Sequence, residues 1–205
     1  MQTATMELIL SLNLIDSDIK EVKATKALDN KNIVCLYFGK HERMPDPMCR
    51  PQYKPKYYNG GIMDPIGRDC IKFEMHLKQE FYPAARGQGV EIIYVSGDTS
   101  DRKKKMEKVA ESCLEWDHRP EMPLKKIPGF YGFKIPDLIP LYGALTEDYK
   151  LFECANTHRD IGYTEYDVFP RFVVLKKDGT LISKNAADEV LTKNSVELIQ
   201  EWKTK

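Results

Sequence analysis

A strand, a helix and a second strand follow one another in the first half of the chain, and this order limits the folds open to it. Residues 33–38 form an uninterrupted apolar run, IVCLYF, and residues 90–95 form a β-branched run of similar length. Between them, apolar residues recur every three or four positions, as a helix requires: Phe73, Leu77, Phe81 and Tyr82. We therefore predict a βαβ unit in a parallel or mixed sheet, with a helix over residues 65–84 on one face.

The last third of the chain adds a hairpin and a final helix. The sequence KDGT at residues 177–180 separates two alternating apolar segments, which is typical of a tight hairpin turn. We expect residues 171–176 and 180–183 to join the same sheet. Asn194 or Ser195 can cap a helix that has an apolar edge. The pattern predicts an α/β protein with a central mixed sheet flanked by helices.

The order and spacing of these segments resemble the tryparedoxin and nucleoredoxin branch of the thioredoxin superfamily. Residues 70–98 match the active-site helix and the next strand of that family without a gap. NKNIVCLYF at residues 30–38 is similar to the central strand, and residues 8–28 to the preceding hairpin and short helix. Residues 168–191 are similar to the cis-proline loop and final hairpin. The resemblance implies a thioredoxin-like fold, with an insertion before the active-site helix.

The active-site position of that family is occupied here by GRDC, Gly67 to Cys70. A dithiol enzyme needs a first cysteine at the helix N-terminus, where the helix dipole favours the thiolate, and a second one to resolve the mixed disulfide. Cys70 occupies the second position, and Gly67 offers no nucleophile in the first. The pair Asp64-Pro65 is a typical helix start, which puts Cys70 beyond the first turn. Asp69 opposes a thiolate and Arg68 partly offsets it, so we expect an inert thiol, with a reactive monothiol as the alternative.

A second cysteine, Cys49, provides an alternative source of a dithiol. Its surroundings, MCRP at residues 48–51, also resemble the end of the family motif, with Asp46 in place of the attacking cysteine. Proline-rich sequence follows and cannot continue as a regular helix, so the spacing favours Cys70. A Cys49–Cys70 pair stays open and requires Cα atoms within about 7 Å. Cysteine and histidine residues lack the short spacings of zinc sites, so we expect no metal and no cofactor.

Two proline-rich stretches are predicted insertions in a single domain that covers residues 1–205. They span about 39–66 and 114–160, and we expect irregular structure over residues 114–142, which carry five prolines. The first insertion directly precedes the predicted active-site helix, and its tyrosines offer contact area for a protein partner. Phe169-Pro170 matches the cis-proline loop that pairs with substrate in the family. The candidate binding residues are Gly67, Arg68, Asp69, Phe169, Pro170, Tyr53, Tyr57 and Tyr58.

Composition narrows the class of partner. Lys plus Arg equals Asp plus Glu at 31 each, so no global charge attracts nucleic acid or an acidic membrane. No segment approaches the roughly 18 apolar residues of a membrane span, and the start lacks the basic region of a signal peptide. Five cysteines without paired spacings favour reduced thiols. We expect a cytoplasmic or nuclear protein with protein partners, and neither nucleic-acid nor membrane binding.

Two functions are therefore in competition. The leading hypothesis is a redox-inactive or weakly active protein-binding or regulatory module that uses the former substrate surface of a thioredoxin-like fold. The rival hypothesis is an active thiol-disulfide oxidoreductase that uses Cys70 alone or together with Cys49.

Overall fold

The predicted first strand forms the centre of the sheet. The computed structural model describes residues 2–16, 20–39, 65–96, 130–133, 135–151 and 170–205. Strand β3 (Ile33–Gly39) is buried at all seven positions. It pairs in parallel with β4 (Val90–Ser96) and antiparallel with β6 (Arg171–Lys176). Since both faces of β3 are covered, its sequence is apolar throughout and does not alternate.

Within the described residues, seven strands make one mixed sheet in the order β2-β1-β5-β4-β3-β6-β7. The outer strands are β1 (Asn13–Ile15), β2 (Glu21–Lys23), β5 (Phe130–Gly132) and β7 (Leu181–Ser183). The turn between β6 and β7 contains Gly179 with a φ of 93°, a left-handed value that favours glycine. The prediction that residues 33–38, 90–95, 171–176 and 180–183 share one sheet is confirmed.

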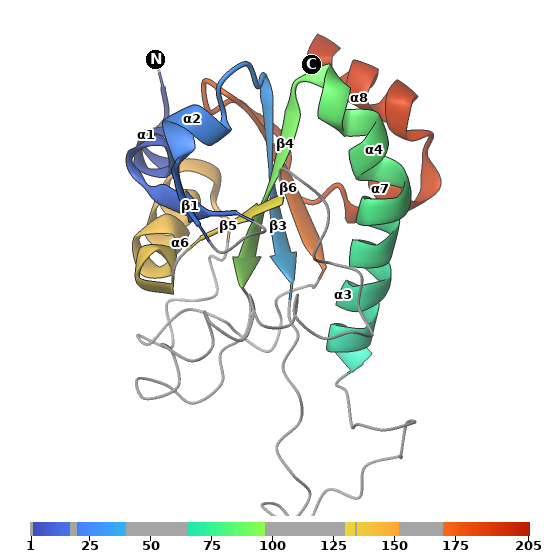
Figure 1. Ribbon diagram of the computed structural model, residues 1–205, viewed down its shortest axis with the longest axis horizontal. Helices are drawn as coiled ribbons and strands as arrows, with labels where there is room; N and C mark the ends of the chain where they lie inside the picture. Colours follow the sequence, from blue (N-terminus) through green and yellow to red (C-terminus); the bar gives the residue numbers. More distant parts are fainter. Residues whose placement is uncertain (1, 17–19, 40–64, 97–129, 134, 152–169) are drawn as a thin grey trace, which may run out of the picture.

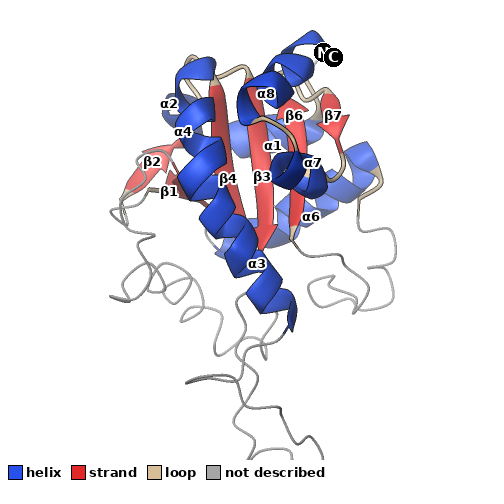
Figure 2. Ribbon diagram, turned by 90° about the vertical axis from the view of Figure 1, so that its right-hand side faces the viewer, coloured by secondary structure: helices blue, strands red, loops and turns tan. Residues whose placement is uncertain are grey.

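Helices cover both faces of the sheet (Figure 1, Figure 2). One face carries α1 (Ala4–Ser11), α2 (Ala24–Ala27) and α6 (Ile135–Tyr149). The other carries α3 (Pro65–His76), α7 (Ala187–Thr192) and α8 (Ser195–Thr204), together with the helical turns that follow α3. Alternate residues of β3 point to opposite cores, so Leu36 lies in the first and Tyr37 in the second.

A long helical segment carries the predicted active-site residues. After α3 it continues as a π-helical turn, η2 (Leu77–Phe81), then as α4 (Tyr82–Ala85) and a short 3₁₀ turn, η3 (Arg86–Gln88). Pro83 explains the wider turn, because proline has no N–H to donate and its ring crowds the carbonyl four residues earlier. The predicted helix over residues 65–84 is confirmed on one face of the sheet.

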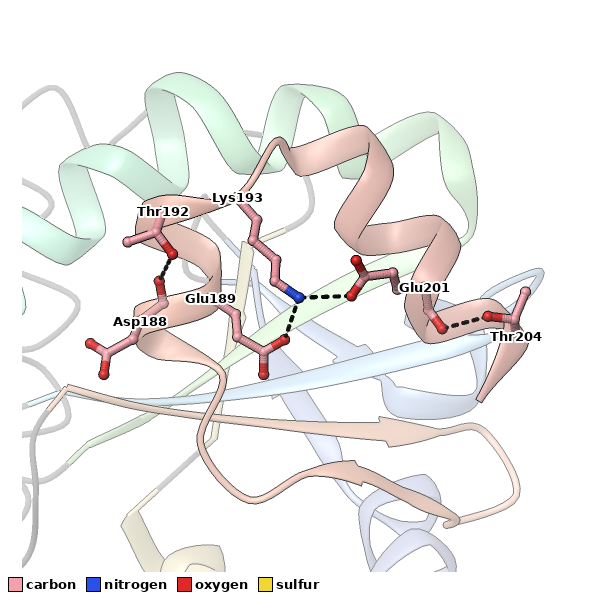
Figure 3. Close-up of polar contacts among 6 residues, drawn as sticks. All are labelled: Asp188, Glu189, Thr192, Lys193, Glu201 and Thr204. Atoms are coloured by element: carbon pink, nitrogen blue, oxygen red, sulfur yellow. Dashed lines mark hydrogen bonds and ion pairs between the residues drawn. The ribbon is translucent and has the colours of Figure 1, made fainter.

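The two C-terminal helices are joined by polar contacts at the surface (Figure 3). Lys193, between α7 and α8, places its Nζ 3.4 Å from Glu189 and 2.8 Å from Glu201. Both contacts are solvent-exposed, so water and salt weaken them. As predicted, Asn194 caps α8: its side-chain oxygen accepts from the backbone N–H groups of Val196 and Glu197.

The prediction of irregular structure over residues 114–142 was wrong for its second half. Residues 130–132 form β5, and α6 begins at Ile135. Pro136 stands in the first turn of α6, where N–H groups have no partner within the helix, and is therefore tolerated. Pro140 does lie inside the helix, yet Leu141 and Leu145 beside it are fully buried. Apolar burial against the sheet outweighs the hydrogen bond that Pro140 removes.

Helix α1 was not anticipated, whereas the hairpin and short helix predicted within residues 8–28 are present as β1, β2 and α2. The Thr3 side chain accepts from the backbone N–H of Met6 and so caps α1. The Tyr149 hydroxyl of α6 is 3.0 Å from the Thr3 hydroxyl and donates to the Gly179 carbonyl at 2.6 Å. The single-domain arrangement with insertions at 39–66 and 114–160 stays a prediction, because most of both insertions lies outside the described residues.

Candidate functional site

The candidate site lies at the edge of the sheet where β3 and β4 end and β6 begins. Gly39 is in register with Ser96, and Phe38 with Arg171. Helix α3 starts on the same side of the molecule, at Pro65 (Figure 1). Segments far apart in the sequence therefore meet at one edge, as sites do at the carboxyl ends of strands in α/β proteins.

Cys70 is the sixth residue of α3, and its side chain is completely buried. The helix begins at Pro65 as predicted, so Cys70 lies beyond the first turn, where the helix dipole has little effect on a thiolate. Gly67, Arg68 and Asp69 also belong to α3, but their side chains lie outside the described part of the molecule.

Tyr37 of β3 lies against the cysteine. Its hydroxyl donates to the Cys70 carbonyl at 3.2 Å. Its ring centroid is 5.4 Å from that of Phe73 and 5.5 Å from that of Tyr94, and the Tyr94 hydroxyl donates to the Gly39 carbonyl at 3.1 Å. The sequence analysis counted Tyr37 only as part of an apolar strand. The sequence does show a hydroxyl-bearing residue two positions before the end of an apolar strand, and this feature could have indicated its role.

Glu74 is a buried carboxylic acid one turn after Cys70, and only 5% of the residue is exposed. The acidic side chains of Glu74 and Cys70 both act on the Tyr37 hydroxyl. On the next turn, Lys78 Nζ is 4.0 Å from Glu74 Oε2. Burial, and then the neighbouring acidic groups of Glu74 and Cys70, hold the pKa of Tyr37 well above its ordinary value. The Tyr37 hydroxyl therefore stays protonated and acts as a donor. The sequence analysis also missed Glu74, although its i+4 spacing to Cys70 was visible.

Side-chain contacts fix the elements around this cluster. The Nε2 atom of His76 is 2.9 Å from the Val190 carbonyl, which joins α3 to α7. The Asn185 side-chain oxygen accepts from the backbone N–H groups of Phe172 and Ala187 at 3.0 and 3.2 Å. The start of β6, next to Pro170, is thereby held to the loop before α7. His76 is a partly exposed helix residue and Cys35 is a buried core residue.

Several predicted site residues lie outside the described residues: Cys49, Tyr53, Tyr57, Tyr58 and Phe169. The proposed Cys49–Cys70 pair and the cis bond before Pro170 therefore stay predictions. In the described ranges, no group of three or more histidine, cysteine or acidic residues could hold a metal ion. No helix in those ranges is long and apolar enough to cross a membrane.

Comparison with known proteins supports the fold. No family model matches the sequence, and neither does any curated protein. Thioredoxin from Wuchereria bancrofti superposes with a TM-score of 0.53 and 22% identity over 96% of both chains. Thioredoxin related protein 16 from Carcinoscorpius rotundicauda gives 0.51 and 20% identity, over 95% of this chain and 96% of that one. Tryparedoxin I from Leishmania major gives 0.50 and 15% identity, over 90% and 88%.

The chain therefore has a thioredoxin-like fold, a mixed sheet flanked by helices, as the sequence resemblance implied. At these levels of identity the likeness concerns the fold, and a fold alone does not define an activity. The function depends on the side chains of the site.

Proposed function

We propose that this protein is a thioredoxin-fold protein-binding or regulatory module that performs little or no dithiol exchange. The observation that carries the proposal is the state of the remaining cysteine: Cys70 is completely buried, inside α3, beneath Tyr37. Thiol-disulfide exchange begins with attack by an accessible thiolate and ends with release by a second thiol. Gly67 supplies neither thiol, and the burial of Cys70 opposes the first step.

The rival function is an oxidoreductase that uses Cys70 alone or with Cys49. A monothiol enzyme needs its sulfur at the surface, and the packing of Cys70 against β3 favours the binding module over this alternative. The dithiol alternative depends on the approach of Cys49 to Cys70. It is decided by an activity measurement on the protein and on its Cys49→Ser variant.

The first test is reduction of insulin disulfides. We expect negligible turnover by the unmodified protein and measurable turnover by Gly67→Cys, because the substitution adds a thiol at the third residue of α3, in the first turn. Gly67→Ser is the matched control, since it adds a side chain of similar size without a thiol. Robust turnover before any substitution would refute the proposal, and its loss in Cys49→Ser would identify Cys49 as the second thiol.

The proposed binding surface is the sheet edge where Gly39, Ser96 and Arg171 meet, extended by residues 39–66 and by Phe169-Pro170. This edge corresponds to the substrate side of the fold that the sequence resembles. A formal net charge of zero and the three tyrosines at 53, 57 and 58 favour a protein partner over nucleic acid. The five cysteines without paired spacings favour reduced thiols, and on this ground we propose a cytoplasmic or nuclear location.

Deletion of residues 41–62 tests this surface. We expect the variant to melt in one cooperative transition, because the sheet and both cores are built from other residues. We expect it to lose partners that the full chain captures from cell extract by cross-linking and mass spectrometry. A chain in which Tyr53, Tyr57 and Tyr58 are all serine should lose the same partners. Retention of those partners by both variants would place the binding surface elsewhere.

A further inference from the structure

A buried carboxylic acid beside the remaining cysteine is unusual enough to need an explanation. A charged group removed from water costs free energy unless other groups compensate it. Glu74 is 5% exposed and follows Cys70 by four residues, which places both side chains on one face of α3. The two are therefore neighbours at the contact between α3 and β3.

Two described groups bear on the charge of Glu74. Lys78 Nζ is 4.0 Å away, at the outer limit of an ion pair. Tyr37 contributes a hydroxyl, which carries a single proton. That proton is donated to the Cys70 carbonyl at 3.2 Å, and the Glu74 and Cys70 side chains both raise the pKa of the Tyr37 hydroxyl. An ionised Glu74 and a Cys70 thiolate would therefore place two negative charges near the same hydroxyl.

Three other titratable side chains of the described residues, near this contact, have other neighbours. Tyr94 of β4 packs on Tyr37 and donates to the Gly39 carbonyl. His76 of α3 contacts the Val190 carbonyl of α7. Arg171 of β6 is in register with Phe38, whose side chain belongs to the core on the opposite face of the sheet. Among the described side chains, Glu74 is thus the buried acid on the Cys70 face of α3.

We propose that the Glu74 carboxylate keeps Cys70 in its unreactive thiol form and so sets the reactivity of the site. A thiolate at Cys70 would add a second negative charge beside a buried one, and like charges in a poorly solvated place repel strongly. The inference rests on the proposed function, in which Cys70 is the remnant of a redox pair. It adds that the charge of Glu74, as well as burial, keeps the Cys70 thiol unreactive.

Alkylation of Cys70 by iodoacetamide measures this directly. The thiol loses its proton to the buffer, the sulfur attacks the CH₂ carbon, a sulfur–carbon bond forms, and iodide leaves with the electron pair of the broken bond. Rates at each cysteine are followed by peptide mass spectrometry on the full chain. We expect Glu74→Gln to accelerate alkylation of Cys70 about tenfold at pH 7 and to move its pH profile about one unit lower. Glutamine keeps an acceptor for Tyr37 and removes only the charge.

Two controls separate a charge effect from a loosened fold. Cys35 is a free and fully buried cysteine in strand β3 of the same molecule, so general opening of the structure would accelerate both cysteines together. Glu80→Gln removes the same formal charge from the next helical turn, where the side chain is 66% exposed. We expect neither Cys35 in Glu74→Gln nor Cys70 in Glu80→Gln to change by more than about twofold. Equal acceleration of Cys35 and Cys70, or no acceleration of Cys70, would overturn the inference.

The outcome is independent of the insulin test. Turnover by the unmodified protein would remove the proposed function, whatever the alkylation rates. An unchanged Cys70 rate in Glu74→Gln, together with absent turnover in the unmodified protein, would leave the proposed function intact and reject the role of Glu74.

Discussion

Replacing Phe172 by alanine is expected to lower the free energy of unfolding by about 3–5 kcal/mol, the usual cost of deleting a buried aromatic ring. Phe172 is fully buried where β6 meets the helices of one face. Its ring centroid lies 5.6 Å from that of Phe73, 5.9 Å from that of Phe81 and 6.4 Å from that of Trp202. The cavity would open between the sheet and both α3 and α8. Denaturant unfolding at equilibrium measures the change.

The Phe172→Ala substitution should also change the reactivity of Cys70 in the candidate site. Phe73 packs on Phe172 and on Tyr37, so loss of the Phe172 ring loosens the helix that buries Cys70. We expect faster alkylation of Cys70 in Phe172→Ala and an intermediate effect in Phe172→Leu, which fills more of the space. Leu191→Ala is the control, because Leu191 is a large apolar residue of α7 that is 45% exposed. A loss below about 1 kcal/mol in Phe172→Ala would mean that the surrounding rings close the cavity.

Replacing Lys31 by methionine is expected to cost about 3 kcal/mol at neutral pH, because it leaves a buried carboxylate without its cation. Glu91 is 2% exposed, and its Oε2 atom is 2.9 Å from Lys31 Nζ. The other oxygen accepts from the Tyr82 hydroxyl at 3.2 Å and from the backbone N–H of Ile92 at 3.1 Å. Methionine retains the length of the lysine stem, so the substitution mainly removes the charge.

The pH dependence follows from the Glu91 carboxyl. Burial raises its pKa above the ordinary value of 4.5, although Lys31 pulls it back down. A raised pKa means that the folded state binds the proton more tightly. The stabilisation from this proton is complete below the unfolded pKa and is lost as the pH rises through the folded pKa. Without Lys31 the folded pKa rises further, so the deficit of Lys31→Met should be larger at pH 8 than at pH 5.

A double substitution provides the control. Glu91→Gln keeps acceptors for Tyr82 and Ile92 and removes the charge, so Lys31→Met/Glu91→Gln should recover much of the stability lost in Lys31→Met. Its stability should also depend less on pH than that of Lys31→Met. A double variant as unstable as the sum of the two single variants would contradict the charge argument and point to lost packing of the lysine stem instead.

The elements that the sequence predicted correctly are those whose signal is local. The apolar run at 33–38 and the β-branched run at 90–95 read as buried strands because both faces of each strand are covered. The KDGT turn is set by the left-handed conformation of Gly179, and the start of α8 by the Asn194 cap. Each depends on a few adjacent residues.

The elements that the sequence analysis missed or misjudged depend on distant partners. The prolines of α6 argue against a helix when the sequence is considered alone, and the helix forms because its apolar side chains pack on the sheet. Glu91 looks like a polar interruption of a strand until Lys31, 60 residues earlier, is brought to 2.9 Å. Local propensity cannot record an interaction of that kind.

For the candidate site too, some properties are local in the sequence and others arise only when the chain folds. That Gly67 supplies no nucleophile and that Cys70 falls beyond the first helical turn follows from local sequence, because side-chain chemistry and the position of a helix start are local properties. That Cys70 is fully buried, with its carbonyl hydrogen-bonded to the Tyr37 hydroxyl, follows only from the folded structure. Tyr37 lies 33 residues before Cys70 and reaches it only when α3 packs against β3. Burial and the charges beside a thiol arise from that packing, and they govern whether the thiol can react.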